Sequence, residues 1–215
     1  MIDLSQAVYA IGRNGPSGVQ LLGTAFAVGA NKIATAYHVV GGDDRDLVMI
    51  APKIAHFSEY QDTADGRVNP LRLKIAAADP VRDLCVLQSD EFSLRFSYGL
   101  GSTDSSPPGT PIVTLGFPHA NHGRLVLTQQ NANVGARVLI ENARQKNKHI
   151  ILNTQAREGQ SGGPVLSATM KEVVAILIGS YAPGGGGGIS LGGVDPHTLH
   201  QTTHAVSAEY LRAML

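Results

Sequence analysis

The sequence predicts an all-β protein of two six-stranded antiparallel β-barrels, completed by a short C-terminal helix. Short apolar or alternating segments recur about every ten residues, as the strands of barrels and sandwiches do. Glycine accounts for 25 of the 215 residues, which suits a chain with many tight turns. Extended amphipathic helices are missing from the sequence before its C-terminus. These three observations favour strands over helices throughout the chain.

The predicted strands fall into two groups of six, separated by the turn-rich residues 101–109. The first group covers residues 7–11, 19–28, 33–36, 47–51, 71–76 and 84–88. The second group covers residues 111–116, 124–129, 133–140, 149–153, 165–168 and 173–178. We therefore expect one barrel within residues 1–105 and a second within residues 106–215, together forming one domain. Residues 207–215 are predicted to form the closing helix, with Ser207 as its N-cap.

The composition limits the partners of the protein. The 17 Lys and Arg residues cancel the 17 Asp and Glu residues, so we expect no nucleic acid partner. No run of ~20 apolar residues is present, so we expect no membrane span. The N-terminus lacks a basic region followed by an apolar run, which predicts a cytoplasmic location. Cys85, the single cysteine, alternates within a predicted strand and is interpreted as a core residue.

The glycine-rich segment around Ser161 is the most specific chemical signal in the sequence. Residues 157–164 read Arg-Glu-Gly-Gln-Ser-Gly-Gly-Pro. Glycines on both sides of a serine permit positive φ angles and close approach of a ligand, as a nucleophile and its oxyanion site require. A plain glycine-rich turn is the alternative, because Gly-x-Ser-x-Gly patterns also arise by chance.

A serine nucleophile needs a histidine base and a carboxylate that orients this histidine. His38 follows the predicted strand 33–36, and Asp83 stands at the start of the predicted strand 84–88. Asp79, beside Pro80, is the competing carboxylate. Ser161, His38 and Asp83 therefore all lie at strand ends or in loops, where side chains from different strands can meet.

In the chain order His38, Asp83, Ser161, the three segments resemble those of trypsin-like, chymotrypsin-fold serine proteases, nearer the bacterial Deg/HtrA-type branch than the digestive enzymes. Residues 35–38, Thr-Ala-Tyr-His, resemble the family's Thr-Ala-Ala-His block, and residues 83–87 resemble its Asp-Leu-Ala-Val-Leu block. Residues 159–164 resemble its Gly-Asn/Asp-Ser-Gly-Gly-Pro block. The resemblance implies an endopeptidase without cofactor or metal, which uses Ser161 as nucleophile, His38 as general base and Asp83 as its orienting carboxylate, through an acyl-enzyme.

The resemblance also implies how a peptide or protein substrate binds in the cleft between the barrels. The backbone amides of Gly159 and Ser161 would form the oxyanion hole. Gln155, with Ala156 beside it, would lie at the floor of the pocket for the side chain that precedes the cut bond. An amide at this floor predicts a preference for small or medium uncharged side chains.

A substrate strand would pair with the segment Ile178, Gly179, Ser180 and Tyr181. The five consecutive glycines at 184–188 are interpreted as a surface loop or as a mobile wall beside the pocket. A regulatory partner protein is also expected as a candidate binding partner, because a protein that binds this loop would order the wall of the pocket.

Two departures from the family pattern stand beside the predicted catalytic residues. Tyr37 replaces a small residue next to His38. Gln160 replaces the usual Asp or Asn before Ser161, and the sequence has no Ile-Val-Gly-Gly start. We therefore expect the chain not to use the ion pair that switches on digestive zymogens.

Other interpretations are less well supported. An α/β-hydrolase would use the order Ser, Asp, His, with Asp195 and a later histidine, but strand-like rather than helical residues follow Ser161. The spacing of His197, His200 and His204 suits a metal, yet without acidic or thiolate partners a polar loop is favoured. His119 and His122 are also interpreted as loop residues. A non-catalytic or latent peptide-binding module on a protease fold is the alternative from another functional class.

Overall fold

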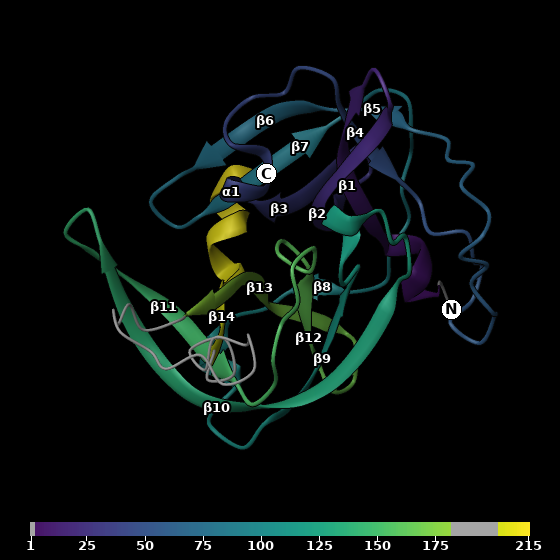
Figure 1. Ribbon diagram of the computed structural model, residues 1–215. Helices are drawn as coiled ribbons and strands as arrows, with labels where there is room; N and C mark the ends of the chain where they lie inside the picture. Colours follow the sequence, from purple (N-terminus) through teal and green to yellow (C-terminus); the bar gives the residue numbers. More distant parts are fainter. Residues whose placement is uncertain (1–2, 182–201) are drawn as a thin grey trace, which may run out of the picture.

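The structure is a computed structural model that describes residues 3–181 and 202–215. Two β-sheets dominate it, the first in purple to blue and the second in teal and green, with its strand β14 (Thr202–Ser207) in yellow in Figure 1. The C-terminal 3-10 helix η5 (Ala208–Met214), in yellow, contacts strands of both sheets. The all-β, two-barrel fold class predicted from the sequence is confirmed.

The first sheet forms a half-barrel from residues in the first part of the chain. Its strands follow the order β5-β4-β1-β2-β3-β7-β6. The chain passes from β5 to β6 through Leu73, so β5 pairs with β4 while β6 pairs with β7. The bounds are β1 (Val8–Gly15), β2 (Gly18–Gly29), β3 (Lys32–Ala36), β4 (Leu47–Ile50), β5 (Leu71–Arg72), β6 (Lys74–Asp79) and β7 (Leu84–Gln88).

The second sheet closes into a six-stranded barrel. Its order is β12-β9-β10-β11-β14-β13-β8, and an additional pairing between β12 and β13 closes the ring. The bounds are β8 (Gly99–Leu100), β9 (Pro111–Gly116), β10 (Thr128–Asn142), β11 (Gln145–Leu152), β12 (Pro164–Ser167), β13 (Glu172–Tyr181) and β14 (Thr202–Ser207). β8 pairs in parallel with β13, so residues before the predicted 105/106 boundary already join this sheet.

Short helices cover the ends of the barrels. They are η1 (Leu4–Ala7), α1 (Tyr37–Val40), η2 (Thr103–Ser105), η3 (Ala120–His122) and η5. The expected capping role of Ser207 is wrong, because its side chain makes no cap hydrogen bond. Its hydroxyl instead accepts the N–H of Thr103 at 3.1 Å, which ties the start of η5 to η2.

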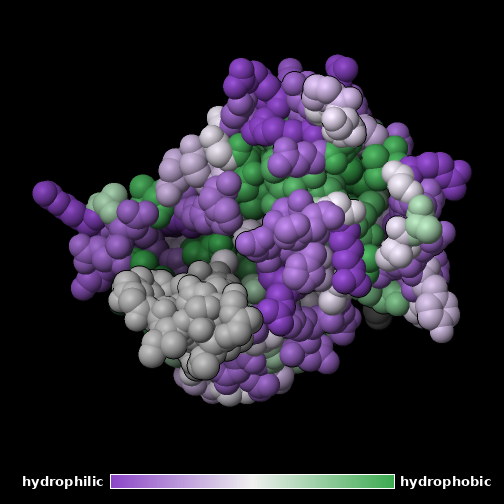
Figure 2. Space-filling model, in the orientation of Figure 1, coloured by the Kyte–Doolittle hydropathy of each residue, from purple (hydrophilic) through white to green (hydrophobic). Residues whose placement is uncertain are grey.

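Alternating apolar side chains fill the interior. Phe26, Ile33 and Leu87 are fully buried in the first sheet, and Ile150 and Val165 in the second. Cys85 is buried as predicted, and burial raises the pKa of its thiol to about 12. Most of the face in Figure 2 is hydrophilic, with an apolar band over the first sheet. Within the described residues, no helix has the length and apolar character needed to cross a bilayer.

Candidate active site

The pairing of β3 with β7 brings His38 and Asp83 together across a long stretch of chain. Ala36, the last residue of β3, lies opposite Leu84, the first residue of β7. The chain continues from β3 directly into α1, which carries His38. Asp83 immediately precedes β7, and its carbonyl accepts the N–H of Tyr37 at 3.0 Å. Two antiparallel strand ends therefore fix the relative position of the two residues.

Both oxygens of the Asp83 carboxylate accept hydrogen bonds from His38. Oδ2 lies 2.6 Å from the ring nitrogen Nδ1, and Oδ1 accepts the backbone N–H of His38 at 2.8 Å. An ionised carboxylate only accepts hydrogen bonds, so this contact favours the tautomer with the proton on Nδ1. Nε2 is then left with a free lone pair, as a general base requires.

Asp79, the competing carboxylate, is engaged elsewhere. It accepts the backbone N–H groups of Val81 and Arg82, both at 3.1 Å. Its Oδ2 also accepts from the Arg82 guanidinium at 2.6 Å. Asp79 therefore stabilises the turn that leads into β7, and Asp83 is the carboxylate that contacts His38.

The Ser161 segment is held from both sheets. The Ser161 carbonyl accepts the N–H of Thr24, on β2 of the first sheet, at 2.9 Å. The next residues pair with β13, with Gly162 N–H donating to the Leu177 carbonyl at 2.7 Å and Leu177 N–H donating to the Gly163 carbonyl at 2.9 Å. Among the described residues, none forms a hydrogen bond with the Ser161 hydroxyl. Ser161 thus lies on the second barrel where it meets the first.

Residues 157–160 form a type II turn directly before Ser161. The N–H of Gln160 donates to the Arg157 carbonyl at 3.1 Å, and Gly159 has a φ of 91°. Since Glu158 is not among the non-glycine residues with positive φ, this combination matches a type II turn with glycine at its third position. A Cβ at Gly159 would clash with Phe117 and Ala120, so only glycine fits.

Two N–H groups of this segment, those of Gly159 and Ser161, have no acceptor among the residues that the structure describes. The Glu158 carbonyl accepts the His119 N–H at 2.6 Å. Because the two ends of a trans peptide point in opposite directions, the Gly159 N–H points away from His119. Within the described residues, neither this N–H nor that of Ser161 donates a hydrogen bond. These are the two donors predicted for an oxyanion hole.

Gln160 supports the same turn from inside. Its side chain is 2% exposed, and its Oε1 accepts the Arg157 N–H at 2.7 Å. The sequence identified Gln160 only as a departure from the family pattern. The structure adds that this neutral side chain gives the turn a second hydrogen bond between Arg157 and Gln160.

Gln155 and Ala156 lie on the stretch between β11 and the turn. Gln155 is half-buried and Ala156 is buried. The Ala156 N–H donates to the hydroxyl of Thr203 at 2.8 Å, and this hydroxyl donates to the Thr154 carbonyl at 2.6 Å. Thr203, on β14, was not predicted from the sequence, because its proximity depends on the pairing of β14 with its neighbours.

The end of β13 has one edge paired with β14. Gly179, Ser180 and Tyr181 lie opposite His204, Thr203 and Thr202. The pairing of β13 with β12 on its other edge reaches only Ile176. In the described part of the chain, no strand pairs with that edge from Ile178 onward. The predicted pairing with a substrate strand requires such an unpaired edge.

The remaining sequence candidates lie in three places. The glycines at 184–188, His197 and His200 lie outside the described residues. His204 lies on β14, where its ring contacts the Thr202 hydroxyl at 3.1 Å, so its expected place in a loop is wrong. His119 is the N-cap of the short helix η3 and His122 is its last residue, on the connection between β9 and β10.

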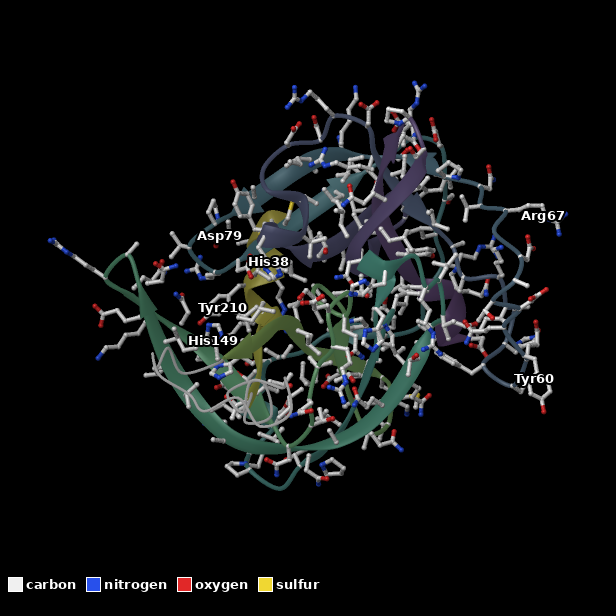
Figure 3. The ribbon with its side chains drawn as sticks, in the orientation of Figure 1. His38, Tyr60, Arg67, Asp79, His149 and Tyr210 are labelled. Carbon is white, nitrogen blue, oxygen red and sulfur yellow. The ribbon has the colours of Figure 1, made fainter. Side chains whose placement is uncertain are left out.

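A polar cluster supports the Asp83 turn from the second barrel. The Arg82 guanidinium donates to Asn147 Oδ1 on β11 at 3.0 Å and lies 4.5 Å from the centre of the Tyr210 ring on η5. The Tyr210 hydroxyl accepts the Lys148 N–H at 2.9 Å. Figure 3 shows His38, Asp79 and Tyr210 on the same side of the molecule, away from Tyr60 and Arg67.

His149, on the same strand as Asn147, is a buried neutral histidine. Burial, together with repulsion from a protonated His204, lowers its pKa to about 4, and the charge of Asp83 opposes this shift. Its Nδ1 has no hydrogen-bond partner in the described structure. A proton on His149 is therefore unfavourable in the folded state.

Residues 23–176 match the model of the trypsin-like peptidase domain. No curated protein matches the chain. The protease domain of MamO from Magnetospirillum magneticum, in its apo form, is 15% identical, with a TM-score of 0.68 over 99% of this chain and 97% of that chain. The Rv3671c protease from M. tuberculosis, in its active form, is 16% identical, with a TM-score of 0.69 over 99% of this chain and 80% of that one.

The HtrA-type protease AlgW, solved with a decapeptide, is also similar to the chain. It is 16% identical, with a TM-score of 0.68, and the comparison covers 98% of this chain and 63% of AlgW. At these identities the likeness to solved structures establishes the fold.

Proposed function

The chain belongs to the trypsin-like peptidase family, and we propose that it is a serine endopeptidase in which Ser161, His38 and Asp83 form the catalytic triad. The observation that carries the proposal is the double hydrogen bond between Asp83 and His38, which leaves Nε2 free to act as a base. The turn at residues 157–160 also supports the proposal, because the N–H groups of Gly159 and Ser161 are available there to an oxyanion. This family membership rests on the matched residues 23–176.

In the proposed reaction, His38 Nε2 takes the hydroxyl proton as the Ser161 oxygen attacks the carbonyl carbon of the scissile bond. The carbonyl oxygen becomes an oxyanion, which accepts from the Gly159 and Ser161 N–H groups. His38 then gives its proton to the leaving amine, and the peptide bond breaks to form the acyl-enzyme. Water attacks the ester with His38 again as base, which releases the acid and restores Ser161.

The substrate proposed for this site is an extended peptide. Its backbone would pair with the open edge of β13 from Ile178 onward. The side chain before the cut bond would meet Gln155, Ala156 and Thr203. The polar groups there are an amide and a hydroxyl that already has two partners, so neither would compensate a buried cation.

A peptide-library cleavage profile of the purified protein tests the proposal, with Ser161→Ala as the blank. We expect cleavage by the wild type only, after small or medium uncharged side chains. Gln155→Asp should shift the preference towards Lys and Arg. Equal cleavage by the Ser161→Ala variant would contradict the triad, and a wild-type profile dominated by Lys and Arg would contradict the role of Gln155.

A further inference from the structure

The side chain of Thr24 joins the two barrels at the nucleophile segment. Thr24 is fully buried on β2, next to the apolar residues Ala25 and Phe26. Its hydroxyl donates to the Gly159 carbonyl at 2.7 Å and accepts the N–H of Phe117 at 3.1 Å. Both partners belong to the second barrel, since Phe117 follows β9 and Gly159 precedes β12. The Thr24 hydroxyl therefore forms its hydrogen bonds with the other barrel and not within its own sheet.

The backbone of Thr24 holds the same segment at a second point. Its N–H donates to the Ser161 carbonyl at 2.9 Å, and its own carbonyl accepts the Thr35 hydroxyl at 2.7 Å. Thr35 lies on β3, which leads directly to His38. One residue of the first barrel therefore contacts Gly159, Ser161 and the strand that leads to the predicted base.

These contacts bear on the two N–H donors of the oxyanion turn. The hydroxyl of Thr24 fixes the peptide between Gly159 and Gln160, and its N–H fixes the carbonyl of Ser161. The Ser161 N–H lies between these two anchors, and the Gly159 N–H lies directly before the first. Thr24 therefore constrains the relative direction of both donors, and such preorganised donors stabilise charge that develops in a transition state.

Resting on the proposed function, we propose that Thr24 is a positioning residue for the oxyanion hole, which acts through its hydroxyl on Gly159. It touches neither the substrate nor the reacting atoms. Its hydroxyl sets how well the two N–H groups bind the oxyanion, while His38 and Asp83 keep their own contact. Loss of the hydroxyl should therefore weaken the transition state more than the bound substrate.

Steady-state kinetics of Thr24→Val, Thr24→Ser and Thr114→Val test this role. Thr114 is the matched control, because it is an equally buried threonine on β9 whose hydroxyl donates, among the described residues, only a long hydrogen bond of 3.5 Å to the Gln130 carbonyl. We expect Thr24→Val to lower kcat on the order of 10- to 100-fold, less than deletion of a donor would, with KM little changed. Thr24→Ser, which keeps the hydroxyl, should recover most of kcat, and Thr114→Val should keep wild-type kinetics.

Two further measurements separate positioning from a general loss of folding. A peptide aldehyde, whose adduct with Ser161 carries an oxyanion, should bind Thr24→Val more weakly by the factor lost in kcat/KM. The pH profile of kcat/KM should keep its shape, because the His38–Asp83 contact is untouched. All assays are run below the lowest Tm of the set. Thr24→Ala, which places no methyl group in the hydroxyl position, replaces Thr24→Val if the latter does not fold.

The outcomes distinguish this role from the proposed function. If the wild type hydrolyses peptides, two results would overturn the role of the Thr24 hydroxyl and leave the proposed function intact. One is an unchanged kcat in Thr24→Val, and the other is an equal loss of kcat in Thr24→Val and Thr24→Ser. A loss confined to KM would also overturn it. Absence of hydrolysis by the wild type would overturn the proposed protease activity and the role of Thr24 with it.

Discussion

Asp83 adopts a backbone conformation that few residues other than glycine tolerate. Its φ is 58°, in the left-handed region, which costs an ordinary residue free energy. Three hydrogen bonds offset this cost: the Asp83 carbonyl accepts from Tyr37, and the carboxylate accepts twice from His38. The conformation aims the carboxylate at the base, so it belongs to the proposed mechanism rather than to folding alone.

Asp83→Asn should lower kcat by roughly 10⁴-fold with little change in Tm. The amide keeps the shape of the side chain but presents a donor to His38 Nδ1, which favours the wrong tautomer. Turnover of a chromogenic peptide ester or amide measures the loss. Asp79→Asn is the control, because Asp79 serves the turn and should cost stability more than turnover. Loss of turnover in Asp79→Asn but not in Asp83→Asn would reverse the assignment.

Gly162 is tightly enclosed where the nucleophile segment meets the first barrel. Its φ is 86°, and a Cβ there would overlap the Thr24 carbonyl oxygen and the Thr35 hydroxyl. Gly109 has a similar φ of 89°, but a Cβ there would meet nothing within 4 Å. A substitution would therefore meet the same backbone strain at both glycines, but a steric overlap only at Gly162.

Gly162→Ala should be far more harmful than Gly109→Ala. The backbone term common to both is about 1–2 kcal/mol. Only Gly162→Ala adds overlap with the first barrel, so its free energy of unfolding should fall further and its activity should be lost. Chemical denaturation and peptide hydrolysis of both variants measure this. Equal loss in the two variants would show that the barrels separate easily at this point.

His149 makes stability depend on pH. Its pKa in the folded state is about 4, below the ordinary value of 6.5, so the unfolded chain binds the proton more readily. Its stabilising effect is therefore complete above about pH 6.5 and is lost as the pH falls towards 4. His204, whose pKa burial also lowers, contributes in the same direction.

His149→Gln should flatten this pH dependence. The wild-type Tm should fall between pH 7 and pH 5 by more than that of the variant, which has no imidazole to protonate at this position. His122→Gln is the control, because His122 is exposed, with its ring 3.7 Å from the Glu158 carboxylate and its ring centre 6.3 Å from that of His119. A variant with the same pH slope as the wild type would assign the dependence to other groups.

Among the elements, the turn between β6 and β7 is held by parts of the second barrel. Arg82 reaches Asn147 on β11 and lies over Tyr210 on η5, and the Val81 carbonyl accepts from Asn142 at 2.9 Å. Asp83 directly follows Arg82 in the chain. The β10–β11 hairpin and the C-terminal helix therefore support the position of the proposed catalytic carboxylate, although neither contributes a catalytic group.

Arg82→Met should lower both kcat and Tm. The variant keeps an apolar chain against Tyr210 but loses the ion pair with Asp79 and the hydrogen bond to Asn147, so the turn should move and Asp83 with it. Arg45→Met is the matched control, because Arg45 also pairs with an aspartate, Asp43, but is largely exposed. We expect roughly a tenfold loss of kcat for Arg82→Met, a partial loss compared with the carboxylate change itself. Equal kinetics of the two variants would contradict a supporting role for the cluster.

At the level of the whole molecule, the sequence predicted what depends on local pattern. The spacing of the apolar segments predicted two barrels, and the chemistry of Ser161 called for a base and a carboxylate at strand ends. β3 and β7 are adjacent antiparallel strands, so the structure brings His38 and Asp83 into contact. The positive φ angles expected of the glycines around Ser161 occur at Gly159 and Gly162.

Features that depend on pairing between distant strands were not predictable from single segments. In the first sheet, residues 71–79 divide their pairing between β4 and β7, which are not neighbours in the strand order. The Ser207 hydroxyl bonds to Thr103 instead of capping the helix, and His204 lies in a strand. The role of Thr24 could not be predicted from its own strand, because its partners Gly159 and Phe117 lie far away in sequence.

The most direct test of the account is labelling of the folded protein with a fluorophosphonate probe, with the modified residue identified by mass spectrometry. This probe reacts with a serine hydroxyl that a base has activated, so it reports the nucleophile without knowledge of the natural substrate. We predict modification of Ser161 in the wild type, and a strong reduction in both His38→Ala and Ser161→Ala. Absence of labelling in folded wild-type protein, or labelling of another serine that persists in both variants, would contradict a catalytic triad at this site.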